Sequence, residues 1–201
     1  MKTTKKDIIL LAAKEAFREY GVDNTSMDKL SALANVSKST VYQYFSSKEA
    51  LVIELLGDLW QKAMDHAEEQ ILNISDIRLQ LEHLLLSEIN LFTSEEYLSL
   101  SKVTIGYFLY RDCAVDKKEC IQRMVKKETK ILEWLQRMVD SKQLLISDIS
   151  YAEAQLQSLI SHPAYWCQAV GIAPLLTEDE KQQLVQRTAD FFLSYYQKPN
   201  F

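Results

Sequence analysis

The sequence predicts an all-α protein of about nine helices, with a small N-terminal helix-turn-helix domain followed by a larger helical domain. Apolar residues recur at helical spacing along almost the whole chain. Only four glycines and three prolines occur among 201 residues, fewer than turn-rich β architectures need. The composition of 47 % apolar and 25 % charged residues is typical of a globular chain.

Three short helices are expected in the first fifty residues. The first has one apolar stripe, and Gly21 should end it in a left-handed conformation; the stripe comprises Ile9, Ala12, Ala13, Ala16, Phe17 and Tyr20. Hydroxyl groups can cap the next two helices, with Thr25-Ser26 before residues 27–34 and Ser37 before 38–45. Asn35 tolerates positive φ and so permits a tight turn between them.

A longer helix is expected over residues 48–72, which would span roughly 37 Å. Asn73-Ile74-Ser75 should break it, and Ser75 can cap a helix over 76–92. Residues 76–92 are apolar in nearly every direction, which predicts the buried centre of the larger domain.

The remaining helices have clear boundaries in the sequence. They are expected over residues 95–110 and 117–140, and from Asp148 onward. Pro163 should end or kink the helix near Ser161. After a loop over 171–174, the capping box Thr177-x-x-Glu180 should open a last helix that reaches residue 197.

Charge divides unevenly along the chain. Residues 1–50 contain eight Lys/Arg and six Asp/Glu, a net charge of +2, whereas residues 51–201 carry −7, which together give the overall −5. A basic head on an acidic body suggests that only the head contacts a polyanion.

Several other classes of protein are disfavoured. No apolar run approaches the ~18 residues of a membrane span. Three cysteines without a C-x-x-C pair indicate reduced thiols and a cytoplasmic protein. The scattered histidines give no metal-ligand spacing, so neither a metal nor a cofactor is expected. Nucleotide-binding, serine-hydrolase and zinc-protease motifs are absent from the sequence, so we expect no enzyme.

Residues 26–45 have the proportions of a helix-turn-helix. Leu30 and Leu33 should anchor its first helix, and Val41 and Phe45 should anchor its second. The exposed face of the second helix then has no carboxylate, which suits a surface that approaches DNA. In such motifs this helix enters the major groove. The face consists of Lys38, Ser39, Thr40, Tyr42, Gln43 and Tyr44.

Three adjacent segments share a fixed spacing: Gly21-Val-Asp-Asn-Thr25-Ser26-Met-Asp-Lys-Leu30, Ala34-Asn35-Val36-Ser37-Lys38-Ser39-Thr40-Val41-Tyr42-Gln43-Tyr44-Phe45, and Lys48-Glu49-Ala50-Leu51. With these segments the region 7–55 resembles the tetracycline-repressor (TetR) family of bacterial transcription regulators. Asn35 stands where that family usually has glycine, and asparagine is a mild replacement because it tolerates positive φ.

The resemblance implies a DNA-binding domain over 1–47 and a ligand-binding and dimerisation domain over 48–201. It also implies a ligand-responsive dimeric repressor that binds a palindromic operator and is released by a small-molecule inducer. Activation of transcription would use the same ligand-dependent binding to DNA. An architectural or protein-interaction factor of the same fold, without an inducer, is the alternative. Neither the operator, the inducer nor the regulated genes can be read from the sequence.

Roles for individual residues follow from the resemblance. Ser26 and Lys48, at helix N-termini, would hold DNA phosphates, and the hydroxyls of Tyr42 and Tyr44 would add phosphate contacts. The readers of base edges would be Lys38, Ser39, Thr40 and Gln43. The alternative is a helix-turn-helix that never binds DNA.

The last two helices are the expected dimer interface, because two such pairs can form a four-helix bundle. The final helix carries an apolar stripe of Leu184, Val185, Thr188, Phe191, Phe192, Tyr195 and Tyr196. Its partner has the small residues Ala152, Ala154, Ser158 and Ser161. The alternative is that the stripe packs inside one subunit.

A ligand cavity could lie among the middle helices. Its candidate lining is Trp60, Met64, Glu88, Phe92, Tyr107, Phe108, Met124, Glu128 and Trp134. Aromatic and methionine residues at helical spacing also occur in plain cores. Glu88 and Glu128 interrupt apolar stripes, so each needs a cation, a hydrogen bond or a raised pKa. An internal pair with Arg111 or Arg123 is one explanation, and selection of a cationic or hydrogen-bond-donating ligand is the other.

Overall fold

The computed structural model describes residues 4–110 and 130–197, with the side chains of 107–110 excepted. Its helices are α1 (Lys5–Tyr20), α2 (Met27–Leu33), α3 (Lys38–Tyr44), α4 (Lys48–Ile71), α5 (Ile77–Phe92), α6 (Glu95–Tyr110), α8 (Lys130–Asp140), α9 (Ile149–Ser161), a π-helix (His162–Trp166), α10 (Cys167–Ala169) and α11 (Glu178–Tyr196). The described residues contain no β-strand, only an isolated antiparallel bridge between Leu144 and Gln197. The all-α prediction is confirmed.

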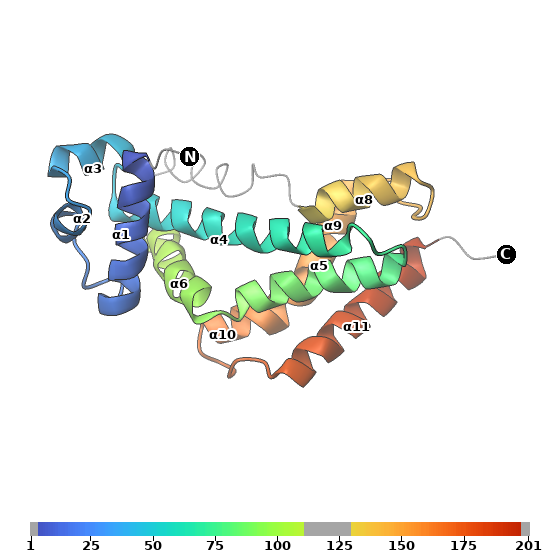
Figure 1. Cartoon of the computed structure of the whole chain (residues 1–201). Coiled ribbons are helices and arrows are strands. Elements are labelled where there is room, and N and C mark those ends of the chain that lie inside the picture. Colours follow the sequence, from blue (N-terminus) through green and yellow to red (C-terminus); the bar gives the residue numbers. More distant parts are fainter. Residues whose placement is uncertain (1–3, 111–129, 198–201) are drawn as a thin grey trace. The chain divides into compact units, whose positions relative to one another are not determined.

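The chain forms two compact units. The first contains α1 to α3, the part of α4 up to Leu59, and α6. The second contains the rest of α4 from Trp60, together with α5, α8, α9, α10 and α11 (Figure 1). The expected boundary after residue 47 remains a prediction. α4 is continuous and contributes residues to both units.

In the first unit, α1 buries the predicted stripe from Ile9 to Phe17. Tyr20, however, is exposed, and the Lys29 ammonium lies 3.0 Å from the centre of its ring. Gly21 ends the helix with φ +79°, but its ψ of 157° is extended and not left-handed helical. The end of the helix was therefore predicted correctly, but its conformation was not.

The second unit is built around α5, which packs against α9, α11 and the π-helix. Figure 1 shows α5 and α11 side by side in this unit. Leu81, Leu84, Leu85 and Ile89 of α5 are fully buried, as the sequence predicts for a central helix, although Leu79 is exposed. Trp134 of α8 is also fully buried, and its indole N–H donates to Gln80 Oε1 over 2.7 Å.

Side-chain caps begin three helices of this unit, α5, α9 and α11. α9 begins next to Asp148 as predicted, and the Asp148 carboxylate caps it, while Thr177 caps α11 and forms the expected capping box with Glu180. Ser75 does not cap α5. The Asp76 carboxylate instead accepts the backbone N–H groups of Arg78 and Leu79, because an ionised acceptor binds these donors more strongly than a hydroxyl.

Pro163 ends α9 as expected. The helix stops at Ser161, and Pro163 lies in the first turn of the following π-helix. Proline lacks the N–H that a continuing α-helix would need at this point.

Candidate functional site

The turn between α2 and α3 is fixed by local hydrogen bonds. The Ser26 hydroxyl accepts the Lys29 N–H over 3.2 Å, and the Ser37 hydroxyl accepts the Thr40 N–H over 3.1 Å. Asn35 adopts φ +50°, the conformation that its side chain tolerates. The two caps and the turn therefore form as the sequence predicts.

The core beneath the turn differs from the prediction at one position. Leu30, Val41 and Phe45 are buried, but Leu33 is 51 % exposed. At about 100° per residue, Leu30 and Ala34 point in nearly the same direction, whereas Leu33 lies well to one side of both. Ala34 is buried in its place, so the assignment of Leu33 as an anchor was wrong.

Six of the eight predicted DNA-contact residues lie on α3, and five of these six are exposed: Lys38, Ser39, Tyr42, Gln43 and Tyr44. Thr40 is half-buried, and its hydroxyl lies 2.8 Å from the Ser37 hydroxyl. Its polar group is thus engaged in the cap. The surface of α3 has hydroxyl, amide and ammonium groups but no carboxylate.

A carboxylate does reach Lys38 from the neighbouring helix. The Lys38 ammonium lies 2.6 Å from Asp28 Oδ1, and both side chains are exposed. The hydrogen bond to Asp28 raises the pKa of Lys38 above its ordinary value. Lys38 is the only cation on α3, so this pair neutralises the helix. The sequence alone does not identify Asp28 as the partner of Lys38, because this pairing depends on how α2 and α3 pack.

Lys48 lies at the N-terminus of α4, where a phosphate role was predicted, but its ammonium is already bonded. It donates to the carbonyl of Val22 over 2.8 Å, and its side chain is half-buried. This bond ties α4 to the loop after α1. An ammonium has three donors, so Lys48 retains others for an anion.

The predicted pocket residues that the structure describes are Trp60, Met64, Glu88, Phe92 and Trp134, all in the second unit. The Trp60 and Phe92 ring centres are 5.7 Å apart, and those of Phe92 and Tyr165 are 5.4 Å apart. Tyr165 was not predicted. Met64 and Trp134 are buried. Of the other candidates, the side chains of Tyr107 and Phe108, and all of Met124 and Glu128, lie outside the described residues, as do Arg111 and Arg123.

Glu88 is fully buried, with 0 % of its surface exposed. Its Oε1 accepts a hydrogen bond from the Gln157 amide over 2.5 Å, while its Oε2 has no partner among the described residues. Burial raises the pKa of Glu88 to about 8, against the opposing effect of Gln157, and Glu153 adds a smaller increase by charge repulsion.

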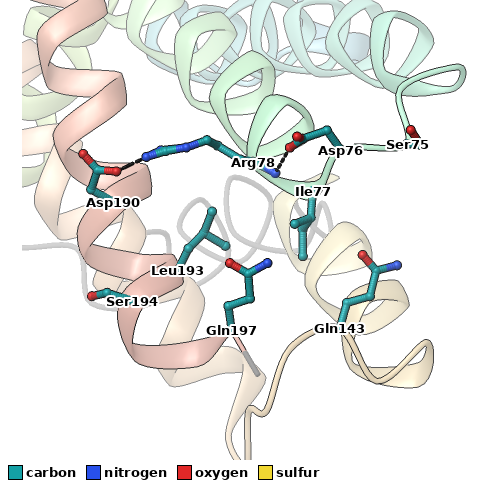
Figure 2. A pocket seen from close by; sticks show the side chains of 9 residues that line it. All are labelled: Ser75, Asp76, Ile77, Arg78, Gln143, Asp190, Leu193, Ser194 and Gln197. Carbon is teal, nitrogen blue, oxygen red and sulfur yellow. Dashed lines mark hydrogen bonds and ion pairs between the residues drawn. The ribbon is translucent and has the colours of Figure 1, made fainter. Parts of the chain in front are cut away.

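A groove of about 520 Å³ lies elsewhere in the second unit. Figure 2 shows Arg78 of α5 reaching Asp190 of α11 there, with Asp76 at the start of α5 and Gln143 and Gln197 beside the groove. None of the predicted pocket residues lines this groove.

The expected dimer stripe on α11 divides in two. Val185, Thr188, Phe192 and Tyr196 are buried within the unit, whereas Phe191 and Tyr195 are 60 % and 75 % exposed. On α9, Ala152 is buried, while Ala154 and Ser158 are exposed. Leu184 is half-buried. Packing inside one subunit thus accounts for four of the seven residues of the stripe, while Phe191 and Tyr195 are accessible.

In the described residues 4–110 and 130–197, every helix is too short or too polar to span a membrane. Within the same ranges, no group of three or more metal-ligating side chains comes together.

Comparison with known proteins places both regions of the chain. Residues 9–55 match the family described as bacterial regulatory proteins, tetR family, and residues 79–198 match the AefR-like transcriptional repressor C-terminal domain. A crystal structure of a TetR family transcriptional regulator from Pseudomonas syringae superposes with a TM-score of 0.70 and 30 % identity, over 99 % of this chain and 100 % of that one.

Two further relatives were compared. FadR from Bacillus subtilis, solved in complex with stearoyl-CoA, has a TM-score of 0.66 at 17 % identity over 93 % of this chain and 97 % of that one, which shows the fold alone. The transcriptional regulator RutR of Escherichia coli K12 is 36 % identical over 87 residues. That match covers 40 % of this chain and 41 % of RutR, so the chain spans about two fifths of this relative's length.

Proposed function

Because the chain belongs to the TetR family of bacterial transcriptional regulators, we propose that it is a homodimeric repressor released from a palindromic operator by a small-molecule inducer. The family and the relatives are transcriptional regulators and not enzymes, in agreement with the missing catalytic motifs. A cytoplasmic location, where operator DNA is found, is part of the proposal.

The observation that carries the proposal is the exposed surface of α3. Its hydroxyl, amide and ammonium groups stand on a short helix held by the Ser37 cap and the Asn35 turn. In helix-turn-helix proteins the N-terminal part of this helix faces base edges. We therefore assign base reading to Lys38, Ser39, Thr40 and Gln43, with the Thr40 methyl against a thymine methyl.

Phosphate contacts would flank this surface. Ser26 caps α2, and the first-turn N–H groups of a helix attract an anion. The phenol groups of Tyr42 and Tyr44 are accessible on α3. Lys48 would bind a phosphate with the ammonium N–H groups that do not donate to the Val22 carbonyl. Such contacts position the protein without reading sequence.

Dimerisation would bring two α3 helices to one operator. The exposed half of the α11 stripe, Phe191 and Tyr195, together with the small exposed residues Ala154 and Ser158 of α9, offers a surface for a second copy. A two-fold dimer reads two half-sites about 34–36 Å apart, or a multiple of that distance. A palindromic operator follows from this symmetry.

An inducer would act through α4, which is unbroken from Lys48 to Ile71. A ligand that prefers the DNA-incompetent state releases the operator, and a complete reversal of populations takes about 5.5 kcal/mol of differential affinity. FadR, a fold neighbour, was solved with an acyl-CoA, which supports a ligand role for this fold. A factor without an inducer is the alternative, and native mass spectrometry for a co-purified small molecule distinguishes the two.

Selection of bound duplexes from a random pool tests the main proposal. We expect a palindrome whose binding weakens steeply with salt, because phosphate neutralisation releases counterions. A monomeric protein that binds no duplex at low ionic strength would contradict the proposal.

A further inference from the structure

We propose that Glu88 is the polar anchor of the effector site and that the effector presents a positively charged amine to it. This inference rests on the proposed ligand response and adds the chemical class of the ligand. It starts from the geometry of one buried carboxyl group and its surroundings in the second unit.

The Glu88 carboxyl group is fixed and only half satisfied. Its helix, α5, is central to the unit, and Leu84, Leu85 and Ile89 beside it are fully buried. The Gln157 amide of α9 donates to one oxygen, while the buried second oxygen has no partner among the described residues. Leaving a buried oxygen unpaired costs about 1–3 kcal/mol, and more for a charged group. A donor group on a bound ligand would supply this missing partner.

The missing partner should be a cation. Within the described residues Glu88 forms no ion pair. Among the residues that the structure describes, Glu153 of α9 raises the pKa of Glu88 by charge repulsion, and it has the same sign. An ammonium group would both donate to the second oxygen and offset this repulsion.

Aromatic rings gather one helical turn beyond Glu88 on α5. Phe92 lies four residues after Glu88, and residues at this spacing share a helix face. Its ring centre is 5.7 Å from that of Trp60 and 5.4 Å from that of Tyr165, and both of these residues are half-buried. Aromatic faces attract cations and pack against apolar groups. Together with the carboxylate they favour an amine with an apolar or aromatic body.

An ordered water molecule is the competing explanation. Buried waters commonly satisfy such oxygens, and Glu88 would then be a structural residue without a ligand. A water would confer no preference among added compounds. The two explanations therefore differ in what matched probes should do.

The experiment uses the full chain and three pairs of probes at neutral pH. Benzylamine, phenethylamine and octylamine are compared with benzyl alcohol, phenethyl alcohol and octanol by isothermal titration calorimetry and thermal shift. We expect at least one amine to bind about tenfold or more tightly than its alcohol, a difference of about 1.4 kcal/mol. Absence of any amine preference would overturn the inference.

Variants assign that preference to Glu88. Glu88→Gln keeps the shape and removes the charge, so it should abolish the preference, and Glu88→Leu provides a second variant should the first fold poorly. Glu82→Gln makes the same chemical change on the same helix, at a residue paired with Arg78, and should preserve the preference. An amine preference that survives in both Glu88 variants would refute the assignment.

Proton release gives an independent readout. Since burial raises the pKa of Glu88 to about 8, the group is mostly protonated at neutral pH. Pairing with an ammonium requires the carboxylate, so Glu88 must transfer its proton to the buffer. The measured heat should therefore vary with the buffer's ionisation enthalpy in wild type but not in Glu88→Gln. Equal variation in both proteins would contradict the role of Glu88.

The outcome is separable from that of the proposed function. If the chain binds its selected duplex but shows no Glu88-dependent preference for amines, the inference fails and the DNA-binding proposal stands. If amines bind in a Glu88-dependent manner but no duplex is bound, the site stands and the proposed function fails.

Discussion

Replacing Asp28 by asparagine should strengthen DNA binding and make it more sensitive to salt. Asp28 holds the Lys38 ammonium at 2.6 Å, and Lys38 is the only cation on α3. In wild type, the pair presents no net charge to DNA, and Lys38 must leave Asp28 before it can reach a base edge. Asp28→Asn removes this competition and leaves one uncompensated positive charge on the helix.

The size of the effect follows from counterion release. Each additional phosphate that is neutralised steepens the dependence of log affinity on log salt by about 0.9. One freed lysine per subunit then gives about 1.8 for a dimer. Between about 50 and 200 mM salt, this corresponds to an additional loss of about 12-fold in affinity relative to wild type. The added charge should strengthen binding to every duplex, but because Lys38 is assigned to a base edge, the selected duplex should gain more than the scrambled one.

Fluorescence anisotropy with a pool-selected duplex and a scrambled duplex of equal length, over a salt series, measures these slopes. Glu15→Gln is the matched control, because it removes one negative charge from an exposed position on α1. Lys38→Met completes a double-mutant cycle. In the Lys38→Met background, Asp28→Asn should have no effect on the slope.

Three results would refute the reasoning. An unchanged salt slope in Asp28→Asn would mean that Asp28 does not withhold Lys38 from DNA. Glu15→Gln could steepen it equally, in which case net charge alone is responsible. If Asp28→Asn still steepened the slope in the Lys38→Met background, the ion pair between Asp28 and Lys38 would not be the cause of the effect.

Three further predictions address stability, assembly and readout. Since the folded pKa of Glu88 lies near 8 and its ordinary value is 4.5, folding stability should fall by about 1.4 kcal/mol per pH unit between about pH 5 and 8; urea unfolding should show this in wild type and lose it in Glu88→Gln, and parallel curves would contradict it. Phe191→Glu should convert a dimer into monomers with little loss of fold, because its side chain is exposed; light scattering and circular dichroism test this, and an unchanged mass would exclude Phe191 from the interface. Thr40→Ala should reduce the discrimination between selected and scrambled duplexes. Lys48→Ala should weaken binding to all duplexes alike and also lower the unfolding temperature, because its bond to Val22 is lost. An equal loss of discrimination in the two variants would contradict the separate assignment of Thr40 to bases and Lys48 to phosphates.

Features that depend on neighbours in sequence could be predicted well. The caps at Ser26, Ser37 and Thr177, the turn at Asn35 and the end of α9 near Pro163 all form as expected. Each depends on a side chain that bonds to backbone two or three residues away, or on φ preferences of one residue. The exposed surface of α3 followed from the same local reasoning.

Errors arose where two local choices compete. Ser75 and Asp76 can both cap α5, and the carboxylate forms the cap. Leu33 fits an apolar pattern, yet Ala34 occupies the buried direction at the end of a helix of only seven residues. Composition alone does not decide between such neighbours.

Pairings between distant residues were beyond the sequence. The Lys38 partner Asp28 comes from another helix, and Gln157 reaches Glu88 from 69 residues away. The sequence did mark Glu88 as an acid in an apolar stripe. Its partner, and the place of Tyr165 beside Phe92, depend on how α5, α9 and the π-helix pack.

The unbroken course of α4 makes the chain sensitive to helical phase. Adding one alanine to an α-helix turns everything after it by about 100° and advances it by about 1.5 Å. An insertion next to Leu59 would therefore misalign the two ends of α4, while four inserted residues would nearly restore the original angle. If operator affinity rises and falls with insert length at the helical period, α4 acts as one rigid helix. If the affinity declines smoothly with insert length, α4 acts as a flexible linker.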